Sequence, residues 1–218
     1  SGCVQNTQQT EKEPIKIGAV LPITGAASNL GEWAQQGLEL AKDEEKFEYN
    51  LQDDQCAGQA AVNAFNNLQL SQVKFTTGPI CNAASIPVSK IAEDEEIIMI
   101  TLGVSTKAIR EAGNYSFTIL PAIEAQTKKL AEYINSQAIK SVSVLYVQDE
   151  YGVENKDTFV EAFSQYGTVT NTEAFERSNN DFRAILTKIK VDPSSAVLVI
   201  GYSPNYINII NQAKEEAK

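Results

Sequence analysis

The sequence contains no histidine, and this absence narrows the chemistry that the protein can perform. Histidine is the commonest general base near neutral pH and the commonest ligand of transition metals. Enzymatic mechanisms would have to use carboxylates, lysines or tyrosines. The sequence also lacks a glycine-rich phosphate loop, zinc-ligand spacing and a nucleophile elbow. We therefore expect no enzymatic activity, no metal site and no cofactor.

Basic residues are also scarce relative to acidic ones. Eighteen lysines and arginines are scattered among 28 acidic residues, which gives a net charge of -10. Nucleic-acid binding needs clustered positive charge, so we expect no nucleic-acid partner. No stretch approaches the roughly 20 apolar residues that span a bilayer. The 218 residues, 43% of them hydrophobic, are enough to build sizeable cores.

Cysteine is rare, and two of the three cysteines stand where strands are predicted to end. Cys56 follows the acidic run Asp53-Asp54-Gln55, and Cys81 precedes a helix predicted to begin at Asn82. A disulfide between them would stabilise the fold by about 3 kcal/mol, more than two buried free thiols would. Such a bond requires an oxidising compartment. We predict the Cys56–Cys81 disulfide and an extracytoplasmic location.

The third cysteine lies in a polar N-terminal segment, residues 1–14. Ser1-Gly2-Cys3 looks like the end of a bacterial lipoprotein signal peptide, with Cys3 as the acylated residue. This predicts a lipid anchor on Cys3 and a flexible tether to the membrane. The alternative is that Ser1-Gly2 is an expression remnant and Cys3 a terminal thiol.

Apolar runs of strand length alternate with segments of helical periodicity along the remaining chain. The predicted strands are Ile15–Leu21, Phe47–Gln52, Val73–Thr76, Ile97–Ile100, Tyr115–Ile119, Val142–Val147, Val169–Phe175 and Ala196–Ile200. This alternation is typical of an α/β fold with parallel sheets and right-handed crossovers. Because it restarts after Leu120-Pro121, we predict two lobes, residues 15–120 and 121–218.

Parallel sheets bind ligands at the carboxyl ends of their strands. A helix beginning at Asn82, directly after such a strand, would offer free amide groups to an anion. Asp53 and Asp54 also follow a predicted strand. Paired carboxylates could perform acid–base chemistry, but we expect these two to form a solvated turn.

Several segments resemble the leucine/isoleucine/valine-binding protein family, the extracytoplasmic receptors of ABC importers, from Ile15 to the end of the chain. They are Ile15–Gly25, Asp53–Cys56, Gly78–Cys81, Ile97–Thr101, Glu150–Gly152, Asn180–Phe182 and Gly201-Tyr202. The resemblance implies the type I periplasmic binding protein fold, two flavodoxin-like (Rossmann-like) lobes that close on a ligand. It also implies truncation at Lys218, before the later strands of the first lobe and an acidic partner for a ligand ammonium.

The resemblance implies a set of ligand-binding residues. The helix beginning with Asn82 would receive the ligand carboxylate, and the Gly103 backbone and the Ser105 hydroxyl would hold the ammonium group. Tyr151 and Tyr202 would close over the ligand from the second lobe. Asn82 stands where branched-chain amino-acid binders have a serine.

Each of these residues has a structural alternative. Asn82 and Ser105 could simply cap helices, because both residue types are favoured at that position. Tyr151 could belong to an ordinary strand-to-helix turn. Tyr202 could be a core aromatic residue whose hydroxyl is satisfied locally.

The resemblance implies a substrate-binding receptor. It would capture a small polar ligand, a branched-chain or other amino acid or a related amide, between its lobes and present it to the membrane permease of an ABC importer. The alternative is a ligand-sensing module of the same fold that signals to a regulatory partner.

Overall fold

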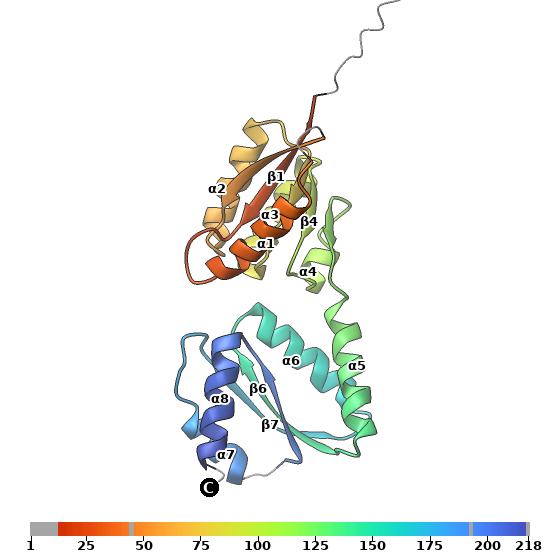
Figure 1. Cartoon of the computed structure of the whole chain (residues 1–218). Coiled ribbons are helices and arrows are strands. Elements are labelled where there is room, and N and C mark those ends of the chain that lie inside the picture. The colour runs from red at the N-terminus through yellow and green to blue at the C-terminus, as the bar shows by residue number, and fades with distance from the viewer. Residues whose placement is uncertain (1–12, 44–45, 192–193, 217–218) are drawn as a thin grey trace, which may run out of the picture. The chain divides into compact units, whose positions relative to one another are not determined.

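The computed structural model describes residues 13–43, 46–191 and 194–216 (Figure 1). The predicted lipid anchor at Cys3 lies outside the described residues. The chain divides into two compact units. The first contains the chain through Val104 and then Ala112–Ile119; the second contains Ser105–Glu111 and the chain from Leu120. The segment Ser105–Glu111, which the sequence assigned to the first lobe, thus groups with the second unit.

The first unit is built on a parallel sheet with the strand order β2-β1-β3-β4-β5. Its strands are β1 (Ile15–Leu21), β2 (Phe47–Asp53), β3 (Phe75–Thr77), β4 (Ile98–Thr101) and β5 (Ser116–Thr118). The crossover helices are α1 (Ser28–Leu40), α2 (Gly58–Leu70) and α3 (Asn82–Asp94). Because every strand runs in the same direction, the loops after β1 to β4 gather at one edge of the sheet.

Helix α2 supplies much of the core of this unit. It buries Ala61, Ala64, Phe65 and Leu68 and contacts β1, β2 and α3. By contrast, α1 buries only Gly31. The aromatic and aliphatic side chains of Phe75, Ile100 and Phe117 stay at least 39% exposed. The two sides of the first sheet are therefore covered unequally by the described residues.

The second unit has a parallel sheet with the order β7-β6-β8. Its strands are β6 (Ser141–Val147), β7 (Thr168–Phe175) and β8 (Ala196–Ile200); its helices are α4 (Lys107–Arg110), α5 (Ile123–Ser136), α6 (Glu150–Phe163), α7 (Arg183–Val191) and α8 (Ser203–Glu216). Helix α5 packs on α6, and α7 packs on α8.

The central strand β6 shows why this unit has two cores. Val142 and Val144 belong to a cluster with Phe159 and Phe163 of α6, whose rings stack with centroids 5.5 Å apart. Leu145 and Val147 belong to a second cluster, which contains Phe175, Phe182, Ile189 and Ile209. A strand covered on both faces must be largely apolar on both faces, which explains the apolar run Val144-Leu145-Tyr146-Val147 in β6.

The predicted α/β class with two parallel sheets is confirmed. Several strand limits differ from the prediction by one or two residues, and the largest difference is that β3 begins at Phe75 rather than Val73. The Val73 N–H donates to the Leu68 carbonyl and so closes the end of α2. Val73, the first residue of the predicted strand, therefore closes the end of α2 and does not belong to β3. Within the described residues, no helix is long and apolar enough to cross a membrane.

Candidate functional site

Asp53, the last residue of β2, joins the loops that follow β1 and β2. Its carboxylate accepts hydrogen bonds from the Ile23 N–H at 2.9 Å, the Thr24 hydroxyl at 2.6 Å and the Gln55 N–H at 3.0 Å. Desolvation raises the pKa of Asp53, but these hydrogen bonds together lower it below its ordinary value. The Asp53 carboxylate, as a charged hydrogen-bond acceptor, therefore holds the loops after β1 and β2 together at the carboxyl edge of the first sheet.

Asp54 contradicts the expectation of a solvated turn, because its side chain is fully buried. Its Oδ1 atom accepts the Cys56 N–H at 2.7 Å, and its Oδ2 atom has no partner among the described residues. Burial raises the pKa of Asp54 to about 6, and the neighbouring Asp53 charge adds to this effect. Two adjacent carboxyl groups thus have opposite pKa shifts, because one is hydrogen-bonded and the other is desolvated.

The structure contains the predicted disulfide between Cys56 and Cys81, whose Cα atoms lie 5.4 Å apart. The bond joins the loop after β2 to the N-terminus of α3. Cys81 is the N-cap of this helix, and its carbonyl accepts the N–H groups of Ala84 and Ser85. The disulfide thereby pins the helix end at the carboxyl edge of the first sheet.

Asn82 is the first residue of α3, as predicted, but its side chain does not cap the helix. The Nδ2 atom is buried and has no hydrogen-bond partner among the described residues. The Ser85 hydroxyl, one turn later, is in the same condition. The start of α3 therefore combines a helix N-terminus, where the Ala84 and Ser85 amides already donate to Cys81, with buried polar side chains.

Gly103 follows β4 and lies against the loop after β3. A Cβ atom at this position would stand 2.6 Å from the Ile80 carbonyl oxygen. The Leu102 N–H donates to the Pro79 carbonyl at 3.3 Å in the same contact. Only glycine permits this approach without a shift of the backbone. Gly103 therefore allows the loop after β4 to pack closely against the loop after β3.

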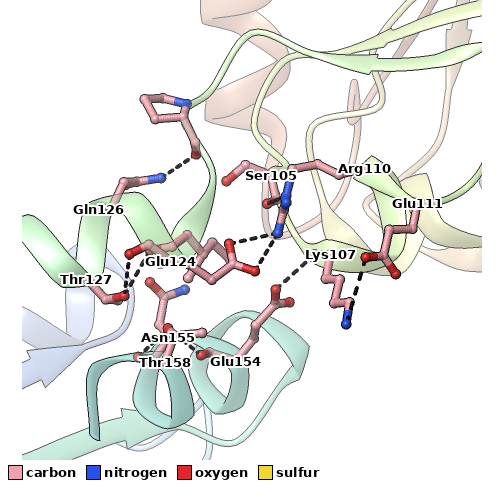
Figure 2. Close-up of polar contacts among 12 residues, drawn as sticks. Ser105, Lys107, Arg110, Glu111, Glu124, Gln126, Thr127, Glu154, Asn155 and Thr158 are labelled. Atoms are coloured by element: carbon pink, nitrogen blue, oxygen red, sulfur yellow. Dashed lines mark hydrogen bonds and ion pairs between the residues drawn. The ribbon is translucent and has the colours of Figure 1, made fainter. Parts of the chain in front are cut away.

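Ser105 belongs to a segment that the second unit holds by charge (Figure 2). Both oxygens of Glu124 accept from the Arg110 guanidinium, at 2.5 and 2.7 Å, and Arg110 Nε donates to the Ser105 carbonyl. Glu154 of α6 accepts the Lys107 N–H at 2.9 Å, which satisfies a free amide of α4. The N-cap of α4 is Thr106, so the capping role considered for Ser105 is wrong.

Tyr151 and Tyr202 lie together in the second unit. Their ring centroids are 5.7 Å apart with a tilt of 33°. The Tyr202 hydroxyl donates to Asp149 Oδ2 at 2.8 Å. Desolvation, followed by this hydrogen bond, raises the pKa of Tyr202, and desolvation raises the pKa of Tyr151. Both phenols are therefore neutral donors rather than bases near neutral pH.

The position of Tyr151 follows from the start of α6. Asp149 is the N-cap and accepts the Gly152 N–H at 2.9 Å. A Cβ at Gly152 would stand 1.8 Å from the Val147 carbonyl oxygen, so glycine is required here. The close turn places Tyr151 at the carboxyl end of β6, and Tyr202 follows the end of β8.

Sequence reasoning missed two members of this group, Asp149 and Arg177. The Arg177 guanidinium carbon lies 4.0 Å from the centre of the Tyr202 ring. Both residues come two positions after a strand end, Val147 of β6 and Phe175 of β7. The rule that parallel sheets bind at their carboxyl edges could have marked both as candidates.

The predicted ligand-binding residues thus fall into groups that belong to different units. Asn82 and Gly103 lie at the carboxyl edge of the first sheet, whereas Ser105, Tyr151 and Tyr202 belong to the second unit. Tyr151 and Tyr202 are in direct ring contact. Within the ranges that the structure describes, no cluster of acidic or cysteine side chains could hold a metal ion.

Comparisons with known proteins agree with one another. A sequence model of the periplasmic binding protein family matches residues 14–216. The leucine-, isoleucine-, valine-, threonine- and alanine-binding protein of Pseudomonas aeruginosa is 26% identical over 93% of this chain and 58% of its own length. The chain therefore spans less than two thirds of this curated relative.

Solved structures show the same fold. A leucine-binding protein from Thermotoga maritima is similar with a TM-score of 0.86 and 23% identity, over 94% of this chain and 61% of that one. A solute-binding protein of an ABC transporter from Rhodopseudomonas palustris, in complex with 3,4-dihydroxybenzoic acid, gives 0.84 and 19%, over 94% and 59%. From residue 14 to residue 216, the chain belongs to the periplasmic binding protein family.

Proposed function

We propose that this chain is the ligand-capturing part of an extracytoplasmic receptor for an ABC importer, and that its ligand is a small amino acid or a related polar molecule. The observation that carries the proposal is the family match over residues 14–216. The relative from P. aeruginosa binds leucine, isoleucine, valine, threonine and alanine by its name. The disulfide agrees with an extracytoplasmic location.

The residue groups suggest roles in binding. In our proposal, the backbone amides at the start of α3, near Asn82, receive a ligand carboxylate, because helix N-termini favour anions. The Gly103 carbonyl and the Ser105 hydroxyl accept from an ammonium group. Tyr151 and Tyr202 supply aromatic surface that excludes water. Neutral phenols suit this role, since a charged group would be expensive to bury.

The partner in this proposal is a membrane permease. Binding proteins of this kind act by population shift: a ligand that prefers the closed form makes that form predominant. A lipid on Cys3 would hold the receptor at the membrane near its permease. Mass spectrometry of the protein from its native membrane tests the anchor, because acylation of Cys3 adds the mass of the lipid and removes its thiol.

Calorimetric titration tests ligand capture. The purified protein is titrated with L-leucine, L-valine, propionamide and urea. Saturable, equimolar binding of any one supports a receptor and gives its ligand class. Two variants localise the site: Tyr202→Ala removes a proposed contact, and Tyr133→Ala removes an exposed tyrosine of α5 in the same unit. If both variants bind like the unmodified protein, the proposed site is wrong.

A further inference from the structure

Among the residues that the structure describes, Arg177 differs from the other two arginines in having no ionic partner. The sequence has three arginines, Arg110, Arg177 and Arg183. Arg110 pairs with Glu124, and Arg183 pairs with Asp181 and Glu215. Among the described residues, Arg177 makes neither an ion pair nor a side-chain hydrogen bond, although acidic residues outnumber basic ones by 28 to 18. Its five N–H donors are therefore available.

The Arg177 guanidinium is nevertheless held in place by the Tyr202 ring. It lies 4.0 Å from the ring centre, a distance at which cation–π attraction is appreciable. The tyrosine itself is fixed, because its hydroxyl donates to Asp149 at 2.8 Å. Stacking occupies a face of the guanidinium and leaves the N–H groups around its rim free to bind an anion.

The backbone that carries Arg177 is also fixed. Asn205, which is buried, donates from Nδ2 to the Arg177 carbonyl at 3.1 Å and to the Asn179 carbonyl at 3.3 Å. Gln212 donates to the Asn180 carbonyl and accepts the Phe182 N–H. Two buried amides of α8 thus anchor the loop between β7 and α7, and a binding residue on an anchored loop loses little entropy when it engages a ligand.

The nearby negative charge does not neutralise Arg177 directly. Asp149 is the acidic residue that is hydrogen-bonded to Tyr202. Both of its carboxylate oxygens accept hydrogen bonds, one from the Gly152 N–H and one from the Tyr202 hydroxyl. No ion pair joins Asp149 to Arg177 in the described part of the chain. Tyr202, Asp149 and Arg177 therefore form a cluster in which the ring supports the guanidinium and both carboxylate oxygens already accept hydrogen bonds. The guanidinium N–H groups have no hydrogen-bond partner among the described residues.

We infer that Arg177 is a specificity-determining residue that binds a carboxylate of the ligand from the second unit. A planar guanidinium matches a carboxylate in a two-bond arrangement that a carboxamide cannot reproduce. This inference rests on the proposed receptor function and narrows its ligand class: the ligand carries a carboxylate that reaches Arg177, and neutral amides and urea are poor ligands.

Carboxylate and carboxamide pairs test the inference by calorimetry. The probes are L-leucine with L-leucinamide, L-glutamate with L-glutamine, and benzoate with benzamide. The variant Arg177→Gln removes the charge, Arg177→Lys keeps it without the planar fork, and Arg183→Gln is the matched control in the same unit. We expect Arg177→Gln to weaken the carboxylate member of one pair by about 10- to 100-fold and its amide by less than about twofold. Arg177→Lys should restore part of the loss.

The outcomes separate this inference from the receptor function. An equal loss for both members of every bound pair, or no loss at all, overturns the role of Arg177 and leaves the receptor function standing. Binding of carboxamides alone by the unmodified protein does the same. Silence toward all six probes overturns both proposals. The affected pair identifies which carboxylate Arg177 binds, α or distal. An exposed charge contact is screened by salt, so the carboxylate preference should also fall as ionic strength rises.

Discussion

At the residue scale, Tyr202 shows how one side chain combines structural and binding roles. Its hydroxyl donates to Asp149, which agrees with the structural alternative of a locally satisfied hydroxyl. Its ring also contacts the Tyr151 ring and the Arg177 guanidinium. The ring is half-buried and packs against the core cluster around Phe175 and Phe182. A side chain with these contacts would present a fixed surface to a ligand.

We predict that Tyr202→Ala weakens ligand binding by at least about 1 kcal/mol, in the manner of an aromatic anchor. Tyr202→Phe should lose less, because it keeps the ring and loses only the bond to Asp149. Calorimetry with L-leucine measures both, and thermal unfolding shows whether either variant is misfolded. A Tyr202→Ala protein that folds normally and binds leucine as tightly as before would remove this residue from the site.

Asp54 yields a prediction about pH. Burial raises its pKa to about 6 in the folded protein, whereas an unfolded aspartate titrates near about 3.9. Between these values the folded state binds more protons, so the Asp54 contribution to stability is greatest below about pH 4 and is lost as pH rises through about 6. The substitution Asp54→Asn introduces a carboxamide that cannot ionise and still accepts the Cys56 N–H. We expect this variant to be more stable at pH 7 by an amount on the order of 1–3 kcal/mol.

Urea unfolding of both proteins between about pH 4 and 7 measures this difference. Asp53→Asn is the matched control with the opposite sign. Because hydrogen bonds lower the pKa of Asp53, its contribution is present above the unfolded pKa and is lost as pH falls through the folded value. Parallel pH profiles for Asp54→Asn and the unmodified protein would show that Asp54 is solvated.

At the element scale, the segment Ser105–Glu111 illustrates how a few polar contacts assign a short element to a unit. Helix α4 has only four residues, too few to be stable alone. It is held by the Arg110–Glu124 pair and by the Glu154 carboxylate on the Lys107 N–H (Figure 2). The pKa of Glu124 is lowered, chiefly by a hydrogen bond from the Glu124 backbone N–H and further by the Arg110 guanidinium. The ion pair is therefore charged at neutral pH.

We predict that Arg110→Met loosens this segment without unfolding the unit. The ion pair is partly exposed, so its loss should cost less than about 1 kcal/mol of global stability. Local opening is more sensitive, and amide hydrogen exchange at residues 105–111 should become faster. Arg183→Met, which breaks the exposed pairs with Asp181 and Glu215 elsewhere in the unit, is the control. Unchanged exchange in this segment would mean that packing alone holds it.

The disulfide is the other element-scale constraint, because it joins the loop after β2 to the start of α3. We predict that Cys56→Ser/Cys81→Ser, or reduction, destabilises the first unit by about 2–4 kcal/mol, since a closed loop limits the unfolded ensemble. Thermal unfolding followed by Trp33, which belongs to this unit, measures the loss. The unreduced protein in urea should show at most one free thiol; three free thiols would contradict the disulfide.

At the scale of the whole molecule, ligand binding and stability are linked. A ligand that binds only the folded state stabilises it in proportion to the logarithm of its concentration, by about 2.7 kcal/mol at 100 times Kd. We predict that L-leucine, if bound, raises the Tm with this dependence, and that Tyr202→Ala shifts the curve to higher leucine concentrations. A Tm that leucine does not move would exclude leucine as the ligand of this chain.

The amino-acid sequence was enough to predict the α/β class, the strands to within two residues of their limits and the start of α3 at Asn82, because apolar periodicity and helix-start residues are local signals. The quoted motifs also sufficed for the family, since their order along the chain is specific. The Cys56–Cys81 pairing followed from two strand ends that a parallel sheet brings to one edge.

The burial and hydrogen bonding of individual polar groups could be read only from the folded chain. Asp53 and Asp54 are identical and adjacent in sequence, yet one accepts four hydrogen bonds and the other is buried with an unpaired oxygen. Likewise, the available guanidinium of Arg177 depends on residues about 25 positions away, Tyr202 and Asn205. Desolvation and ion pairing depend on the neighbours in space, and the local sequence pattern does not contain them.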